Sequence, residues 1–270
     1  MRRRLDAELV RRGLAATREQ AQVDIRSGRV LVGGAPAAKP SHLVAAADPV
    51  EVLGPPSPFV GRGGHKLDGA LTQFALDVGG RRCLDAGAST GGFTDCLLQR
   101  GAGEVVAVDV GYGQLHEQLR RDTRVRNLER TNVRSLNPSA TLGLVSVVVA
   151  DLSFISLRTV LPALVAVAEP GADLVLLVKP QFEAGRRDAS RGRGVVRDPA
   201  VWRRVLDEVV AAVDRGGAST MGAMVSPLTG ADGNVEFFLH GRNGPPGPPP
   251  DPSPVDLDAL VAEALAGVGA

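Results

Sequence analysis

One stretch in the middle of the chain decides the fold: Arg81-Arg82-Cys83-Leu84-Asp85-Ala86-Gly87-Ala88-Ser89-Thr90-Gly91-Gly92-Phe93-Thr94. Its pattern predicts a short buried strand, a turn rich in small residues and the start of a helix. Gly87, Gly91 and Gly92 let the backbone adopt angles that other residues avoid and approach a ligand closely. Free N–H groups at the start of a helix suit the polar or anionic part of a nucleotide-like molecule. We therefore expect a ligand-binding loop here.

This glycine loop differs from two common nucleotide-binding loops. A phosphate-binding loop requires G-x-x-x-x-G-K-[ST], and no lysine follows these glycines. The dinucleotide fingerprint G-x-G-x-x-G is not met either, because Ser89 stands in its middle position. The remaining pattern, D-x-G-x-S-x-G-G, resembles the S-adenosylmethionine loop of class I methyltransferases. An ordinary tight connection between a strand and a helix is the alternative at this point.

From Cys83 onward, strands and helices alternate, which predicts an α/β fold with a doubly wound parallel sheet. We place the strands at 82–86, 104–110, 124–129, 145–151, 172–179, 219–226 and 234–240, and helices at 91–100, 113–121, 156–168 and 199–214. No helix separates the last two strands, so residues 227–233 are expected to close an antiparallel hairpin. That added antiparallel strand is typical of the seven-stranded Rossmann-like sheet of class I methyltransferases and distinguishes it from a dehydrogenase sheet.

Polar residues stand at the carboxyl ends of the predicted strands, where ligands bind in sheets of this kind. Asp85, Asp109 and Asp151 end the first, second and fourth strands. Lys179 ends the fifth strand, and Glu236 lies in the last hairpin. We expect Asp109 to bond the ribose hydroxyls of a nucleoside and the residue after the third strand, Asn132, to contact the adenine edge. The full set expected to bind a cofactor is Asp85, Gly87, Ser89, Gly91, Gly92, Phe93, Asp109, Asn132 and Asp151.

The first fifty residues predict a small α+β unit. Apolar residues recur at helical spacing over 2–14, a second helix is expected over 18–27, and Gly33-Gly34 predicts a hairpin turn after a strand at 28–32. The order of these markers, from R-L-D-x-x-L-V to K-P-S, closely resembles the S4-like RNA-binding domain. Residues 1–66 carry eleven Lys or Arg against six Asp or Glu, whereas the whole chain has a net charge of only +1. Residues 1–66 therefore form a basic N-terminal arm, and the remainder of the chain is acidic. This asymmetry indicates a polyanionic partner for the arm.

The resemblance implies that basic and polar side chains of this arm face RNA phosphates. A Gly/Arg-rich loop over 183–198 adds further cations that could contact the RNA strand. The residues predicted to bind RNA are Arg4, Arg18, Gln22, Arg26, Arg29, Lys39, Arg62, Arg186, Arg187 and Arg193. A solvated charged surface is the alternative for both groups.

Lys66, Asp151, Lys179 and Glu236 match, in order and context, the K-D-K-E tetrad of FtsJ-like ribose 2′-O-methyltransferases. A ribose hydroxyl is a poor nucleophile at neutral pH, so an enzyme must orient it and accept its proton. A lysine acts as that base only when burial or a second cation lowers its pKa. Our hypothesis is that Lys179 is the base, that Lys66 orients the 2′-oxygen, and that the two acids hold the lysines. The alternative is two buried ion pairs that only pin the sheet ends, but such pairs stabilise weakly.

The whole chain from residue 4 to about 240 resembles the TlyA-type rRNA cytidine 2′-O-methyltransferases, a family also labelled haemolysin A. The strongest motifs are Arg62–Leu67, Asp85–Phe93, Asp109–Leu115 and Asp151–Ser156. The resemblance implies S-adenosylmethionine as the cofactor and ribosomal RNA, of both the 16S and the 23S type, as the substrate. The Pro-rich stretches at 54–59 and 244–254 depart from the family pattern.

These features divide the chain into five parts. We assign an S4-like domain to 1–53, a linker to 54–61, a methyltransferase domain to 62–242, a Pro-rich segment to 243–254 and a C-terminal helix or tail to 255–270.

Several classes of protein are disfavoured. No run of about 18 uncharged apolar residues is present, and charges interrupt any N-terminal signal core. Cys83 and Cys96 are expected to be reduced core thiols, and the four scattered histidines make no metal-ligand pattern. We expect a cytoplasmic, metal-free monomer without membrane contact. A non-catalytic RNA-binding module, a small-molecule methyltransferase and, suggested only by the older family label, a membrane-lytic haemolysin are the alternatives.

Overall fold

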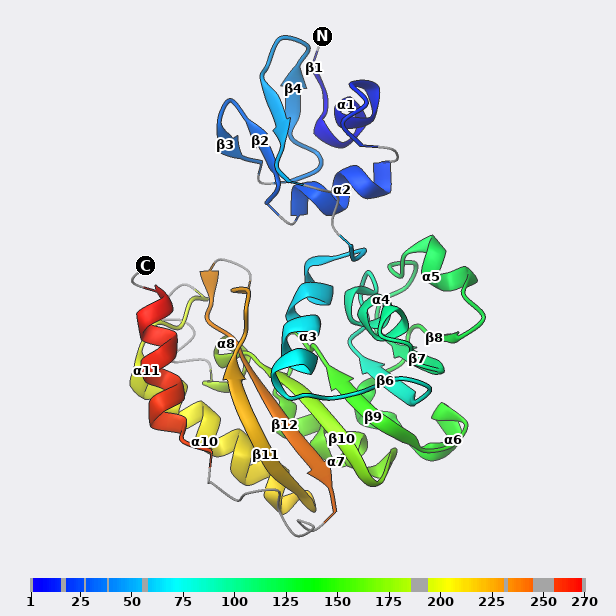
Figure 1. Ribbon diagram of the computed structural model, residues 1–270, viewed down its shortest axis with the longest axis vertical. Coiled ribbons are helices and arrows are strands. Elements are labelled where there is room, and N and C mark those ends of the chain that lie inside the picture. The colour runs from blue at the N-terminus through cyan, green and yellow to red at the C-terminus, as the bar shows by residue number, and fades with distance from the viewer. Residues whose placement is uncertain are drawn as a thin grey trace. The chain divides into compact units, whose positions relative to one another are not determined.

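The structure is a computed structural model, and it describes residues 2–15, 18–26, 28–37, 39–54, 58–185, 194–230, 233–244 and 255–268. The chain divides into two compact units, Met1–Gly64 and His65–Ala270 (Figure 1). Parts of the expected linker and most of the Pro-rich segment over 243–254 lie outside the described residues.

The N-terminal unit combines two helices with short antiparallel strands around a small apolar core. Its elements are β1 (Arg2–Arg4), α1 (Leu5–Arg11), α2 (Arg18–Arg26), β2 (Val30–Val32), β3 (Ala35–Pro36), β4 (Leu43–Ala45) and β5 (Val50–Val52). β1 pairs with β4, and β2 pairs with both β3 and β5. The core is formed by residues that the helical and strand periodicity bring inward, among them Leu5, Leu9, Ala21, Ile25, Val30 and Val44.

The sequence-based helix over 2–14 is wrong at its start. Arg2–Arg4 is extended and forms a ladder with Leu43–Ala45, and the helix begins only at Leu5. The predicted second helix and hairpin are confirmed as α2 and the β2–β3 pair, with Gly33 and Gly34 at φ 61° and 83° in the turn between them. Both angles lie in the left-handed region, which glycine occupies without steric cost.

The C-terminal unit is built on one seven-stranded sheet. Its strands are β6 (Arg82–Ala86), β7 (Glu104–Val108), β8 (Val125–Leu128), β9 (Val145–Ala150), β10 (Ala168–Val178), β11 (Ala218–Val225) and β12 (Phe237–Asn243). They lie in the order β11-β12-β10-β9-β6-β7-β8, and β12 is antiparallel to both of its neighbours. The predicted α/β class, the seven strands and the final antiparallel hairpin are confirmed.

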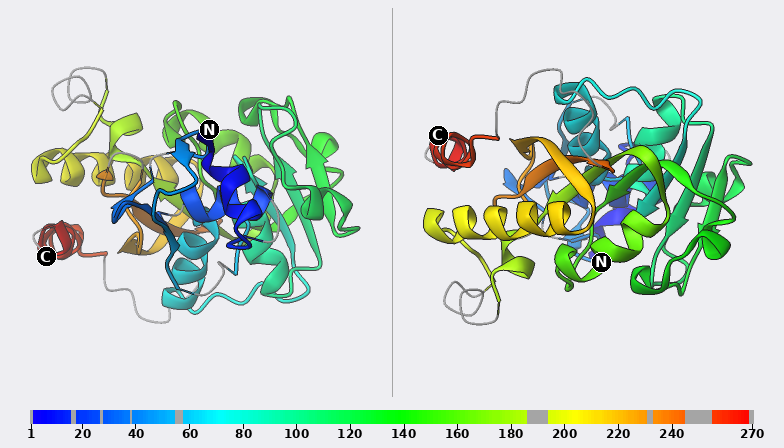
Figure 2. Two further views of the ribbon diagram at one scale, coloured as in Figure 1. Left: turned by 90° about the horizontal axis from the view of Figure 1, so that it is seen from above. Right: turned by 90° about the horizontal axis from the view of Figure 1, so that it is seen from below.

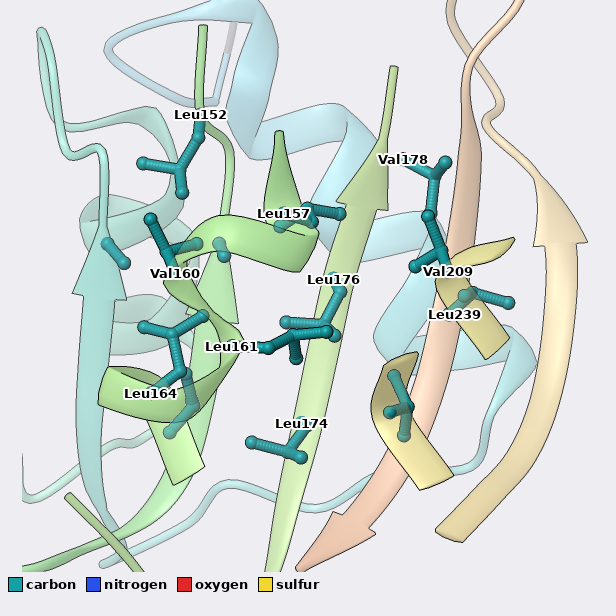
Figure 3. Packing of buried hydrophobic residues seen from close by; sticks show 14 of the residues in the cluster. Leu152, Leu157, Val160, Leu161, Leu164, Leu174, Leu176, Val178, Val209 and Leu239 are labelled. Atoms are coloured by element: carbon teal, nitrogen blue, oxygen red, sulfur yellow. The ribbon is translucent and has the colours of Figure 1, made fainter. Parts of the chain in front are cut away.

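Helices cover both faces of this sheet. They are α3 (Arg62–Gln73), α4 (Gly92–Gln99), α5 (Glu117–Arg121), α6 (Pro138–Thr141), α7 (Leu157–Ala166), α8 (Pro180–Glu183), α10 (Pro199–Arg215) and α11 (Leu257–Val268), with a 3₁₀ turn, η1, at Val133–Ser135. α7 and α10 lie on one face, and α3 and α4 lie on the other (Figures 1 and 2). Figure 3 shows how side chains of α7, β10, α10 and β12 interleave; they include Leu161, Leu164, Leu174, Leu176, Val209 and Leu239.

Two helices are relevant to the site. α3 begins at Arg62, so Lys66 lies in its second turn. The helix expected over 113–121 is only the short α5, because Gly113 has a φ of 70° and His116 caps the helix through its side chain. None of the helices within the described residues is both long and apolar enough to cross a bilayer.

Candidate active site

The register of β10 and β12 brings two distant parts of the chain to one edge of the sheet. Val178, the last residue of β10, pairs with Phe237, the first residue of β12. Lys179 follows the first of these residues and Glu236 precedes the second. Because β12 is antiparallel, its beginning lies at the same edge as the carboxyl end of β10. Asp151 reaches this edge as well, since it directly follows β9.

Lys66 of α3 and Glu236 form a buried ion pair. The Lys66 ammonium lies 2.5 Å from Oε2 of Glu236, and the two residues are only 5% and 2% exposed. Gly230 makes room for this carboxylate, because a Cβ at residue 230 would lie 2.0 Å from Oε1 of Glu236. Removing either partner of such a buried pair would leave an uncompensated charge in the interior and would destabilise the fold strongly.

Lys179 and Asp151 form the second pair. The ammonium of Lys179 contacts Oδ1 of Asp151 and donates a hydrogen bond of 3.2 Å to the hydroxyl of Ser153. The two side chains are 11% and 23% exposed, so this pair is more accessible than the first. The structure therefore resolves the four residues of the tetrad into two ion pairs, each joining one lysine to one acid.

The glycine loop between β6 and α4 has the predicted strand-turn-helix form. Gly87 and Gly91 have φ values of 93° and 98°, and each is closely packed. A Cβ on Gly87 would lie 2.3 Å from the backbone oxygen of Asp151, and one on Gly91 would lie 2.2 Å from a methyl group of Leu119. These contacts require glycine at both positions. They join the glycine loop on one side to the stretch Asp151–Ser156, which we call the tetrad loop, and on the other side to α5.

Asp109 organises the backbone on the other side of the glycine loop. Its carboxylate accepts hydrogen bonds from the backbone N–H of Ser89 at 2.8 Å and from that of Gly111 at 2.7 Å. The aspartate is thus held at the end of β7, beside the loop, as the strand-end pattern predicts.

Asp85 is fully buried, and only one of its oxygens is satisfied. Oδ2 accepts a hydrogen bond of 2.7 Å from the Thr94 hydroxyl, whereas Oδ1 has no hydrogen-bond partner among the described residues. Burial raises the pKa of Asp85 from its usual 3.8 to about 7, and the nearby Asp151 carboxylate adds to that rise. Such a group favours a cationic neighbour.

A pocket of about 370 Å³ lies between the glycine loop and the tetrad loop. Five of the predicted cofactor residues line it, namely Gly87, Ser89, Asp109, Asn132 and Asp151. The others lie behind this wall. Phe93, for example, is 3% exposed and stacks on Phe238, with ring centroids 6.2 Å apart. Asp109 and Asp151 are the charged residues of the lining, so the described pocket wall is acidic.

Sequence reasoning missed several residues of this pocket. Ser153 and Gln114 supply polar groups, and Phe154 stands at the wall with 92% of its surface exposed. Phe154 also has a φ of 64°, a left-handed conformation that is strained for a bulky residue. The stretch Asp151–Ser156 was recognisable as a motif, but no signal in it indicates that the aromatic side chain points outward.

Among the predicted RNA-binding residues of the N-terminal unit, Arg4, Arg18 and Arg29 form ion pairs within it. The buried Asp6 carboxylate binds Arg4 at 2.9 Å, Arg18 at 3.1 Å and the Gln22 amide at 3.2 Å. Hydrogen bonding to Arg4 is the largest of the effects that hold the pKa of Asp6 well below its usual range. The two arginines are still about half exposed, at 47% and 52%, so each can also meet a phosphate.

Arg29 and Lys39 differ in their surroundings. The Arg29 guanidinium binds Asp24 at 2.6 Å and donates to the backbone oxygens of Leu53 and Gly54 at 2.8 Å each. Arg29 therefore holds the end of the N-terminal unit, at Leu53 and Gly54, next to Asp24 of α2. Lys39 is exposed, which suits a contact with RNA. Of the remaining predicted residues, Arg26 belongs to α2 and Arg62 begins α3, while Arg186, Arg187 and Arg193 lie outside the described residues.

Comparison with known proteins identifies the family. The model of FtsJ-like methyltransferases matches residues 59–243, and the model of the S4 domain matches residues 3–50. The 16S/23S rRNA (cytidine-2'-O)-methyltransferase TlyA of Mycobacterium tuberculosis is 55% identical over 239 residues, which are 88% of this chain and 89% of that protein. The chain belongs to the TlyA family. The prediction of a methyltransferase with an N-terminal S4 domain is confirmed.

Other TlyA relatives carry a different name. Hemolysin A of Brachyspira hyodysenteriae is 38% identical over 88% of this chain and 98% of its own length. A solved structure of a hemolysin-named protein from Streptococcus thermophilus is 41% identical and superposes with a TM-score of 0.78, covering 99% of this chain and 97% of its own. Within the part of the chain that the structure describes, no cluster of three or more His, Cys, Asp or Glu could hold a metal ion.

Proposed function

We propose that this protein transfers a methyl group from S-adenosylmethionine to the 2′-hydroxyl of cytidine in ribosomal RNA, of both the 16S and the 23S type. The observation that carries this proposal is the meeting of the Lys66–Glu236 and Lys179–Asp151 pairs at the sheet edge. The second pair directly adjoins the acidic pocket, because Asp151 belongs to both. The name of the M. tuberculosis relative supports the same reaction and substrate.

The pocket fits this cofactor by charge. S-adenosylmethionine carries an ammonium and a sulfonium cation, and the described charged residues of the lining, Asp109 and Asp151, are both acidic. The unsatisfied Oδ1 of Asp85 is a further acceptor behind the glycine loop. We assign the ribose hydroxyls to Asp109 and the adenine edge to Asn132. The Asn132 amide can donate there, because its oxygen already accepts the N–H of Arg134 at 3.0 Å.

The tetrad supplies the groups that the acceptor hydroxyl needs. Bound S-adenosylmethionine provides an electrophilic methyl group on its sulfonium sulfur. Lys179 accepts the proton of the 2′-hydroxyl after its own ammonium group has lost one, and Asp151 and Ser153 fix the position of its nitrogen. Lys66, held by Glu236, orients the ribose oxygen.

The S4 unit provides the second contact with RNA. Lys39 and the half-exposed faces of Arg4 and Arg18 present positive charge to the phosphate backbone, which fixes position and not sequence. We expect the protein to act on ribosomal subunits in the cytoplasm, as a monomer.

Labelled methyl transfer tests this proposal. Ribosomal subunits from a strain that lacks the enzyme are incubated with S-adenosylmethionine carrying a labelled methyl group, and the rRNA is digested to nucleosides. The label is expected in 2′-O-methylcytidine from both subunits. Label in one subunit only would restrict the substrate, and label in neither, with cofactor binding intact, would reject ribosomal RNA. A non-catalytic RNA-binding module would give no label, and its binding to RNA would not depend on the side chain that Lys66→Ala removes.

A further inference from the structure

The loop that carries Asp151 is fastened at its far end by a buried glutamate. Glu183 is the last residue of α8 and is 3% exposed. Its Oε1 accepts the backbone N–H of Leu157 at 2.6 Å, and its Oε2 accepts the hydroxyl of Ser156 at 2.5 Å. Ser156 caps α7 and Leu157 begins it, so the carboxylate binds the point where the loop ends.

Arg158 completes the surroundings of this glutamate. Its guanidinium lies 3.3 Å from Oε2 of Glu183 and also donates to the Glu183 backbone oxygen at 2.8 Å. The same guanidinium binds Glu208 of α10 at 2.5 Å. A buried carboxylate is costly unless its oxygens are bonded and its charge is paired. Both conditions are met here, which makes Glu183 a firm anchor.

The same two segments meet at two further places. Lys179, the N-cap of α8, contacts Asp151 and Ser153 at the start of the loop. The ring of Phe182 lies against that of Phe154 in the middle, with centroids 5.1 Å apart. The loop is thus joined to the α8 turn at its beginning, its middle and its end, and Glu183 makes the last of these contacts.

The loop needs such restraint because its backbone is strained. Phe154 has a φ of 64° and is almost fully exposed, so its own burial does not stabilise this conformation. Strained residues persist only where their surroundings over-determine them. Ser156 and Leu157 follow Phe154 by two and three residues, and their bonds to Glu183 supply this restraint on the carboxyl side.

We propose that Glu183 is a positioning residue for methyl transfer: it fixes the Asp151–Ser156 loop against the α8 turn and so sets the alignment of Asp151 with Lys179. It does not touch substrate or cofactor. This inference rests on the proposed function, because the alignment matters only if the pair acts in the reaction.

The test compares Glu183→Ala with Glu183→Gln. The alanine variant is expected to lower kcat by about 10- to 100-fold, the range that misplacement of a catalytic group by about 1 Å produces. The affinity for S-adenosylhomocysteine, measured by calorimetry, is expected to change less than kcat, because Asp109 and Asn132, which we assign to the nucleoside, lie outside the Asp151–Ser156 loop. Glutamine keeps an oxygen for the Leu157 N–H and is expected to restore most of kcat.

Glu208→Gln is the matched control. It removes the other carboxylate of Arg158 but leaves the bonds of Glu183 to Ser156 and Leu157 intact, so kcat should stay at the wild-type value. Ser156→Ala removes the hydrogen bond between the Ser156 hydroxyl and Glu183 by changing the partner that lies in the loop. In a double-mutant cycle, Ser156→Ala and Glu183→Ala are expected to be clearly non-additive, because they break the same contact.

Hydrogen exchange provides a readout that does not depend on activity. Peptides covering 152–157 should exchange faster in Glu183→Ala than in the wild type or in Glu208→Gln. Unchanged exchange in this segment, an unchanged kcat, or a kcat loss that matches a loss of folded protein would overturn the inference. If the wild type itself transfers no methyl group to rRNA, the proposed function fails, and with it the positioning role. The exchange data would then still decide whether Glu183 anchors the loop.

Discussion

The ammonium group of Lys66 lies 2.5 Å from a carboxylate oxygen of Glu236, a residue 170 positions further along the chain. The pair exists because α3 passes the edge of the sheet where β12 begins. The adjacent Val178–Phe237 pairing places Lys179 at the same edge. Two lysines and two acids from four separate segments therefore meet beside the pocket.

Removing one partner of this pair should be costly for stability as well as for activity. Lys66→Ala leaves a buried carboxylate without its cation, which is expected to lower the free energy of unfolding by about 3–5 kcal/mol. The double variant Lys66→Met/Glu236→Leu replaces the pair by apolar side chains and should restore most of that stability. Methyl transfer should be absent from both variants. Denaturant unfolding and the labelled-methyl assay measure the two effects, and an active double variant would show that the pair is only structural.

A methyl group at residue 230 should disturb the same carboxylate. The Cβ of Gly230→Ala would lie 2.0 Å from Oε1 of Glu236, so the glutamate must move. We expect kcat to fall by about 10- to 100-fold. Gly267→Ala is the control, since a Cβ there meets nothing within 4 Å. Equal activity of the two variants would mean that the site tolerates a displaced Glu236.

Asp85 should make stability and cofactor binding depend on pH in opposite directions. Its folded-state pKa of about 7 lies above the usual 3.8, so between these values the folded protein holds a proton that the unfolded chain has lost. Stability therefore falls as the pH rises from about 4 to 7, and Asp85→Asn should reduce this fall. Binding of the cationic cofactor favours the ionised form, so its affinity should rise over the same range in the wild type. Melting curves and calorimetry across pH check both trends, and a pH-independent affinity would argue against an electrostatic effect of Asp85 on the bound cofactor.

Lys39 and Arg29 should separate RNA binding from domain stability. Lys39 is exposed, so Lys39→Ala should weaken binding to rRNA fragments and reduce the slope of log K against log salt by about one, without changing the melting temperature. Arg29 holds Asp24 and two backbone oxygens. Arg29→Ala should therefore lower the stability of the N-terminal unit by roughly 2 kcal/mol. A salt slope that both variants leave unchanged would contradict the assignment of Lys39.

The sequence is sufficient to predict the sheet and the residues at its edge. Buried strands such as β7 are near-continuous apolar runs, and the polar residues that follow them stand out against that background. Lys179 and Glu236 could be selected for the same reason. Their pairing with Asp151 and Lys66 could not, because it depends on strand register and on the path of α3, which no local pattern encodes.

Other features escape prediction because they arise from tertiary contacts. α8 has only four residues, and Glu183 at its end bonds to residues 26 and 27 positions away. The strained, exposed Phe154 is likewise held by its neighbours and not by its own propensity. At the N-terminus, three arginines join a strand because Leu43–Ala45 is there to pair with them. The helical periodicity of residues 2–14, taken alone, predicts a helix that includes these three arginines.

The most direct test of the proposed mechanism examines Lys179→Ala in one preparation with two measurements. Calorimetry with S-adenosylhomocysteine reports whether the pocket is intact, and the labelled-methyl assay on ribosomal subunits reports the reaction. We expect affinity close to that of the wild type together with no detectable 2′-O-methylcytidine. Methyl transfer at an undiminished rate would show that Lys179 is not the base and would contradict the tetrad mechanism.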